Sequence, residues 1–112
     1  MKLAVQPFED IRDGRKVIES RLYDEKRQMI HVGDEIIFSN NDDTTQTLST
    51  KVIELLLHPT FNELFADAEP SLFGGTNREE LLSQIKTFYS DEEEARYGVV
   101  GIRLQKIDEI VN

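Results

Sequence analysis

Three charged side chains within six positions, Lys16, Glu19 and Arg21, are the residues whose types and spacing best suit chemistry in this sequence. On an extended backbone alternate residues share a face, so Glu19 and Arg21 project together while Ile18 and Leu22 point the other way. A carboxylate accepts hydrogen bonds from the exocyclic amine of a base, and a neighbouring lysine or arginine binds phosphate. The triplet therefore indicates either a recognition site or a solvated strand face with local ion pairs.

The elements before the triplet decide where it lies. A short strand over 2–5 and a helix over 7–13 precede Gly14, and glycine is the residue type that closes helices in the left-handed conformation. Such an ending delivers Arg15 and Lys16 to the start of the next strand. We therefore include Arg15 among the candidate binding residues.

The rest of the sequence alternates between strand-like and helix-like segments. A hairpin is expected from a strand over 35–39 and a long strand over 46–57 that is bent or bulged midway. Capping boxes predict three further helices, which begin at Thr60 with Glu63, Thr76 with Glu79, and Ser90 with Glu93. The second of these helices is expected to reach Tyr89, and a last strand follows over 99–104.

These elements define an α+β fold in a single domain over residues 1–112. We expect about five to six mostly antiparallel strands with flanking helices. A small β-barrel would protect the strand edges. An open sheet covered by helices is the alternative, because spacing alone does not separate the two.

The charge distribution restricts the class of ligand. The chain has a formal net charge of −9, and residues 41–112 hold fourteen acidic against six basic side chains. Binding to extended duplex DNA depends on many lysine and arginine contacts with phosphate, so it is not expected. Residues 12–27 carry a local excess of positive charge, which favours a small anionic or nucleotide-like ligand there.

What the sequence lacks argues against several other functions. There is no cysteine, and His31 and His58 have no further ligand near them, so neither a metal nor a cofactor is expected. No apolar run approaches the roughly 20 residues of a membrane span. The common phosphate-binding and hydrolase motifs are missing. We expect a cytoplasmic protein without a membrane segment.

Two tyrosines are candidates for stacking on a base. Tyr89 and Tyr97 both lie at the edge of predicted helices, where tyrosine more often packs its ring into the core with its hydroxyl at the rim. We include Tyr97 with the charged candidates as a ligand-binding residue.

Segments spread over nearly the whole chain resemble the activating signal cointegrator homology (ASCH) domain of the PUA-like superfamily. They are the stretch 7–11, the G-x-K-x-x-E-x-R element from Gly14 to Arg21, and the stretches 32–38 and 97–102. The resemblance implies a PUA-like β-barrel with a cleft beside the first helix, lined by Lys16, Glu19 and Arg21. It also implies an RNA- or nucleotide-binding role, so we expect binding rather than catalysis.

Two alternatives remain open. One bacterial branch of these domains hydrolyses acetylated cytidine, and its motif resembles G-R-K-T-I-T-I-R, with a catalytic lysine that Lys16 matches. Glu19 stands in place of the threonine, so an amidohydrolase of this kind would use Lys16 as the base with Glu19 relaying protons. The second alternative is a protein-interaction module that uses the acidic C-terminal half.

Overall fold

The long strands β4 (Thr47–His58) and β5 (Val99–Lys106) form the centre of the sheet in the computed structural model, which describes residues 1–107. The shorter strands are β1 (Lys2–Leu3), β2 (Ile18–Leu22) and β3 (Glu35–Asn40). The sheet order is β1-β3-β4-β5-β2, and every pair of neighbours is antiparallel except β1 with β3. The two edge strands are therefore β1 and β2.

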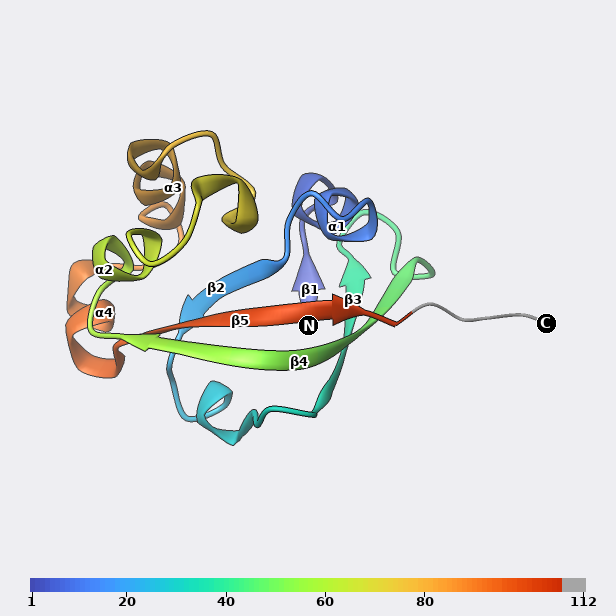
Figure 1. Cartoon of the computed structure of the whole chain (residues 1–112), viewed down its shortest axis with the longest axis horizontal. Coiled ribbons are helices and arrows are strands. Elements are labelled where there is room, and N and C mark those ends of the chain that lie inside the picture. The colour runs from blue at the N-terminus through green and yellow to red at the C-terminus, as the bar shows by residue number, and fades with distance from the viewer. Residues whose placement is uncertain (108–112) are drawn as a thin grey trace.

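The sheet curls so that these two edges approach each other. Arg21 on β2 donates from Nη2 to the carbonyl of Lys2 on β1, at 3.2 Å. The register of β4 shifts between Val52 and Glu54; this irregularity is the one expected midway along the long strand, and a bulge bends the sheet. The result is a half-barrel with flanking helices (Figure 1). The expected α+β class and the five mostly antiparallel strands are confirmed.

Helices lie at the two ends of the central strands. Helix α1 (Val5–Arg12) lies beside β1 and β3. Helices α2 (Phe61–Phe65), α3 (Arg78–Ile85) and α4 (Asp91–Tyr97) gather near the end of β4 and the start of β5 (Figure 1). The chain also has the 3-10 helices η1 (Arg27–Met29) and η2 (Pro70–Phe73).

Two clusters of buried apolar side chains use opposite faces of β5. Val100 and Ile102 pack with Phe8 of α1 in the first cluster, whereas Val99 belongs to the second cluster with the side chains of α2. This division follows from the alternation of side chains along a strand. Ile18 and Leu22 of β2 lie in the second cluster, so the other face of β2 turns toward the first.

Two of the predicted helix starts are confirmed. The side chains of Thr60 and Ser90 accept hydrogen bonds from the amides of Glu63 and Glu93. Ser90 and Glu93 complete a reciprocal capping box at α4. These bonds satisfy amides that have no partner within the helix.

The cap predicted at Thr76 is wrong. Asn77 caps α3 instead, and its side chain accepts a hydrogen bond from the amide of Glu80 at 2.8 Å. The hydroxyl of Thr76 donates to the carboxylate of Glu80. Asparagine is at least as good a capping residue as threonine. The helix therefore begins one residue later than predicted.

The predicted end of this helix is also wrong, because α3 ends at Ile85 and does not reach Tyr89. The amides of Thr87 and Phe88 donate to carbonyls three residues back. This tighter pattern is the one with which helices often finish. The residues after Ile85 therefore lie in a turn between α3 and α4.

The first strand and helix meet earlier than expected. The strand ends at Leu3, and α1 begins at Val5 rather than at Pro7. Pro7 is the third residue of α1, where an amide would have no partner within the helix, so its missing N–H costs nothing.

Candidate functional site

Glu19 of β2 holds the two cations of the charged triplet. Lys16 Nζ lies 2.7 Å from Glu19 Oε1, and Arg21 Nε donates to Glu19 Oε2 at 2.8 Å. Glu19 is 5% exposed, and the side chains of Lys16 and Arg21 are 11% and 16% exposed. The structure thus brings the three residues into one largely buried cluster rather than onto a solvated strand face.

The register of β2 against β5 explains why charged residues are buried here. Glu19 lies opposite Ile102, and Arg21 lies opposite Val100. Residues opposite each other on neighbouring strands share a face of the sheet, and both β5 residues belong to the apolar cluster beside α1. A lone carboxylate in such surroundings would be costly, so two cations are needed to hold it there.

Burial and ion pairing act in opposite directions on the Glu19 carboxyl. Burial by itself raises its pKa, because the charged form loses water. The charges of Lys16 and Arg21, together with the hydrogen bonds that both donate, outweigh burial, so the pKa of Glu19 lies below its usual value. The Glu19 carboxyl is therefore charged at neutral pH and accepts hydrogen bonds from both basic side chains.

The backbone before β2 places Lys16 in the cluster. Gly14 takes a φ of +79° just past the end of α1, as expected for a glycine that ends a helix. The amides of Arg15 and Lys16 then both donate to the carbonyl of Asp10, at 2.9 and 3.0 Å. The prediction that the helix ending delivers Lys16 to the strand is confirmed.

The segment around η2 holds Lys16 from the opposite side. Val17 donates its amide to the carbonyl of Leu72 at 2.9 Å. Gly74 follows η2 with a φ of +92°, and a Cβ placed there would lie 3.0 Å from Lys16 Cδ. The absence of a side chain at Gly74 thus leaves room for the aliphatic part of Lys16.

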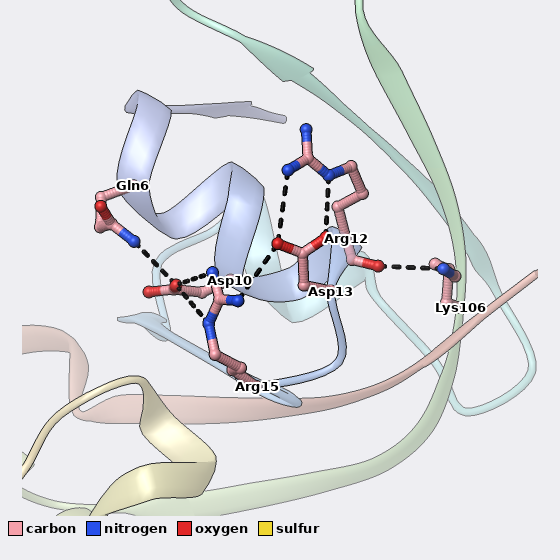
Figure 2. A network of polar contacts seen from close by, with 6 residues as sticks. All are labelled: Gln6, Asp10, Arg12, Asp13, Arg15 and Lys106. Carbon is pink, nitrogen blue, oxygen red and sulfur yellow. Dashed lines mark hydrogen bonds and ion pairs between the residues drawn. The ribbon is translucent and has the colours of Figure 1, made fainter.

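Arg15 lies outside the cluster. Its guanidinium contacts Asp10 at 2.9 Å and Asp13 at 3.2 Å (Figure 2). Asp13 also pairs with Arg12, whose carbonyl accepts a hydrogen bond from Lys106 of β5 at 2.9 Å. This network ties the end of α1 to the loop that follows it and to β5.

A cavity of about 250 Å³ opens beside β2. Its polar wall comes from β1, the start of α1 and β2, and its charged members are Lys2, Lys16, Glu19 and Arg21. Its apolar wall comes from the segment between β4 and β5, and its large members are Phe65, Phe73, Leu81, Ile85, Phe88 and Tyr89. Arg15 is not part of the lining. A mostly apolar cavity with a few convergent polar groups is typical of a small-molecule site.

Of the two candidate tyrosines, Tyr89 lines the cavity and Tyr97 does not. The Tyr89 ring stacks on Phe61 with centroids 5.8 Å apart, and its side chain interacts with Arg21. Tyr97 packs against the second apolar cluster, with the guanidinium of Arg96 5.1 Å from its ring centroid.

Sequence reasoning did not predict the apolar wall of the cavity. In a helix that reaches Tyr89, as predicted, Leu81, Ile85 and Phe88 would share one apolar face, yet Phe88 is 74% exposed. The helical spacing of apolar residues continues to Tyr89, whereas α3 ends at Ile85. This mismatch is the feature of the sequence that relates to the apolar wall. A helix that ends early leaves the last apolar residue without a place in the core.

Neither histidine lies at the cavity. His58 Nε2 contacts Asp67 Oδ2 at 2.9 Å. Among residues 1–107, no three histidine, cysteine, aspartate or glutamate side chains are grouped so as to hold a metal ion. In that same part of the chain, no helix combines the length and apolar character needed to cross a membrane.

A comparison with family models identifies one family, and two solved structures share the fold. The model of the ASCH domain matches residues 1–108. The crystal structure of hypothetical protein PH0355 is similar, with 33% identity, a TM-score of 0.79, and coverage of 96% of this chain and 100% of that one. The solution structure of protein PF0455 from Pyrococcus furiosus has 29% identity and a TM-score of 0.71, and covers 96% of this chain and 99% of that one. A comparison with curated proteins finds no significant match.

Proposed function

This chain belongs to the ASCH domain family, and from that membership and the geometry of its cavity we propose that it binds a nucleotide or a short stretch of single-stranded RNA beside β2. The observation that carries the proposal is the cavity itself, whose lining combines Lys16 and Arg21, both bonded to Glu19, with a group of large apolar side chains. A nucleotide has two matching parts, a phosphate and a planar base whose faces pack against apolar side chains.

The charges at the cavity favour an anion. Its lining contains three basic side chains, those of Lys2, Lys16 and Arg21, and one carboxylate, that of Glu19. The chain as a whole has a net charge of −9, so this lining is positive on a negative molecule. A local excess of positive charge attracts and orients an anionic ligand.

The role of Glu19 differs from that of a group which reads a base. Both of its oxygens already accept hydrogen bonds, from Lys16 and Arg21. We therefore assign Glu19 to positioning: it fixes the directions in which the two cations point. Lys16 and Arg21 are the residues that would contact the ligand.

The size of the cavity favours a small ligand over a duplex. A volume of about 250 Å³ lies just below the range of roughly 300–1,000 Å³ that is common for small-molecule sites. Duplex binding needs a broad basic surface with many phosphate contacts. One nucleotide, free or at an unpaired position of RNA, suits the site.

Isothermal titration with the four ribonucleoside 5′-monophosphates and a single-stranded hexaribonucleotide tests the proposal. We expect Lys16→Met to weaken binding by about tenfold, which corresponds to loss of one charge-assisted contact of roughly 1.4 kcal/mol. Lys51→Met is the matched control, because Lys51 lies on β4 outside the cavity and its loss changes the net charge equally. The proposal fails if the wild-type protein binds none of these probes, or if both variants weaken binding equally.

The alternatives gain no support from the site. An amidohydrolase would need a free amine as base, whereas Lys16 Nζ lies 2.7 Å from the Glu19 carboxylate in an ion pair. No observation favours the acidic surface as a protein-binding site. Incubation with N4-acetylcytidine in the same set of experiments tests hydrolysis directly. If the wild-type protein hydrolyses it and Lys16→Met does not, the amidohydrolase hypothesis replaces the binding proposal.

A further inference from the structure

Phe88 differs from every other phenylalanine of the chain. Five of the six phenylalanines are buried, with exposed fractions of 4% or less, whereas Phe88 is 74% exposed. It nevertheless lines the cavity. A single exposed apolar side chain is common on protein surfaces and needs no explanation by itself. What distinguishes Phe88 from the other exposed large apolar side chains is its place in the cavity lining.

The backbone fixes where this ring lies. Phe88 follows α3, and its amide donates to the carbonyl of Ile85 at 3.0 Å. Both residues line the apolar wall. The ring is therefore carried by a hydrogen-bonded turn at the mouth of the cavity rather than by a free loop.

The neighbouring aromatic rings are already engaged with one another. Phe61 stacks on Phe65 and on Tyr89, with centroids 5.9 and 5.8 Å apart, and Phe65 meets Phe73 edge to face at 5.1 Å. Tyr89 also interacts with Arg21. Phe88 takes part in none of these ring contacts within residues 1–107. Of the aromatic side chains that line the cavity, Phe88 is the most exposed and the one without a recorded ring contact among residues 1–107.

We propose that Phe88 is the stacking residue of the cavity and that its partner is one unpaired nucleobase. This inference rests on the proposed nucleotide-binding function and adds the recognition element for the base. A cavity of about 250 Å³ exceeds the roughly 150 Å³ that holds a benzene molecule, and so it has room for one base rather than a stack of several. The base lies against Phe88 while its phosphate lies toward Lys2, Lys16 and Arg21.

Stacking predicts tolerance of base identity. Every base has a π face, so an aromatic platform binds all four, and its removal weakens binding by about tenfold. A leucine at this position keeps apolar area but has no flat ring. Phe88→Leu is therefore expected to lose most of the stacking contribution, whereas Phe88→Trp keeps or increases it.

The chain contains no tryptophan, so Phe88→Trp introduces a single fluorescent indole at the cavity mouth. Titration with the four ribonucleoside 5′-monophosphates and the hexaribonucleotide is expected to quench this indole with saturation. Met29→Trp is the matched control, because Met29 is also 74% exposed and does not line the cavity. Its fluorescence is expected to stay constant.

The outcomes separate this inference from the function on which it rests. Quenching of Phe88→Trp together with a loss of about tenfold in Phe88→Leu supports stacking. If the probes bind in a Lys16-dependent way but Phe88→Leu binds within twofold of wild type, or if the indole is unaffected, stacking is overturned and the binding function stands. If no probe binds to the wild-type protein, both are overturned. Circular dichroism of each variant confirms that the fold is retained.

Discussion

At the scale of single residues, the charged cluster depends on Glu19, because its buried carboxylate pairs with both Lys16 and Arg21. Replacing one member of such a cluster leaves the others without compensation in an apolar environment. Glu19 is 5% exposed and faces the apolar cluster beside α1 through its neighbour Ile102. Its contribution is therefore to the stability of the fold as well as to the direction of Lys16 and Arg21.

The lowered pKa of Glu19 predicts a specific dependence of stability on pH. A carboxyl with a folded-state pKa below its unfolded value stabilises the protein above the unfolded value, here about 4.5, and this stabilisation is lost as the pH falls through the lower folded-state value. We expect Glu19→Gln to reduce the free energy of unfolding at pH 7 by on the order of 3 kcal/mol, and the gap to wild type to narrow below pH 4.5.

Urea unfolding of wild type and variant from pH 7 to pH 3 measures this gap. Glu25→Gln is the control, because Glu25 is exposed and changes the charge equally. A gap between Glu19→Gln and wild type that stays constant over the whole range would contradict a carboxylate held by ion pairs.

The elements around β2 determine where Lys16 points. The Gly14 turn brings its backbone to the start of the strand, and η2 closes over its aliphatic part at Gly74. The far end of Lys16 is bonded to Glu19, so the side chain is held at both ends. Gly74, which is not part of the cavity lining, thus controls the position of a side chain that is.

Gly74→Ala tests this control. The new Cβ would lie 3.0 Å from Lys16 Cδ, and we expect it to displace the ammonium group and weaken nucleotide binding by about fivefold, roughly 1 kcal/mol. Gly33→Ala is a matched control, since Gly33 has a similar φ of +97° and nothing within 4 Å of the added Cβ. Both variants are expected to lose about 1–2 kcal/mol of stability to the left-handed backbone. Equal affinities of the two variants in calorimetric titration would remove Gly74 from the site.

Local sequence signals predicted the charged half of the site but not its apolar half. The spacing of Glu19 and Arg21 places them on one face of a strand. The glycine that ends the preceding helix explains why Lys16 lies at the start of that strand. The apolar half depends on where α3 ends, and there Thr87 and Phe88 carry no strong stop signal. The difference between Tyr89 at the cavity and Tyr97 away from it depends on packing between segments, which local pattern does not encode.

At the scale of the whole molecule, the lining of the cavity is positively charged, whereas the chain as a whole is negatively charged. The chain has a net charge of −9, and the cavity lining contains only three basic side chains, so the proposed site can bind only a few phosphates. Affinity is therefore expected to depend on salt only modestly.

For the hexaribonucleotide, we expect the logarithm of the affinity to fall with the logarithm of salt concentration with a slope of about −1 to −2, as for two or three phosphate contacts to a single strand. Lys16→Met is expected to make this slope shallower by about 0.7, and Lys51→Met to leave it unchanged. Titrations between 50 and 300 mM salt provide the measurement. A slope steeper than about −4 would indicate an extended basic surface instead of one cavity.

The order of the strands was beyond sequence reasoning. Strands β3 and β4 follow each other in the sequence, and the polar segment between them predicts the turn of their hairpin. The pairings of β1 with β3 and of β2 with β5 join distant segments, and no single-sequence pattern states which of them meet. Those pairings bring the edges β1 and β2 together at Arg21, and so they create the polar wall.

The two walls of the cavity come from different stretches of the chain. The charged wall belongs to residues 2–21, and the apolar wall to residues 65–89, within the insertion between β4 and β5. Substitutions in the insertion can therefore change the apolar wall while the charged residues themselves stay the same. Under the proposed function, a relative that keeps the charged strand and changes the insertion would still bind a phosphate but would prefer a different base, so one scaffold could give rise to binders of different nucleotides.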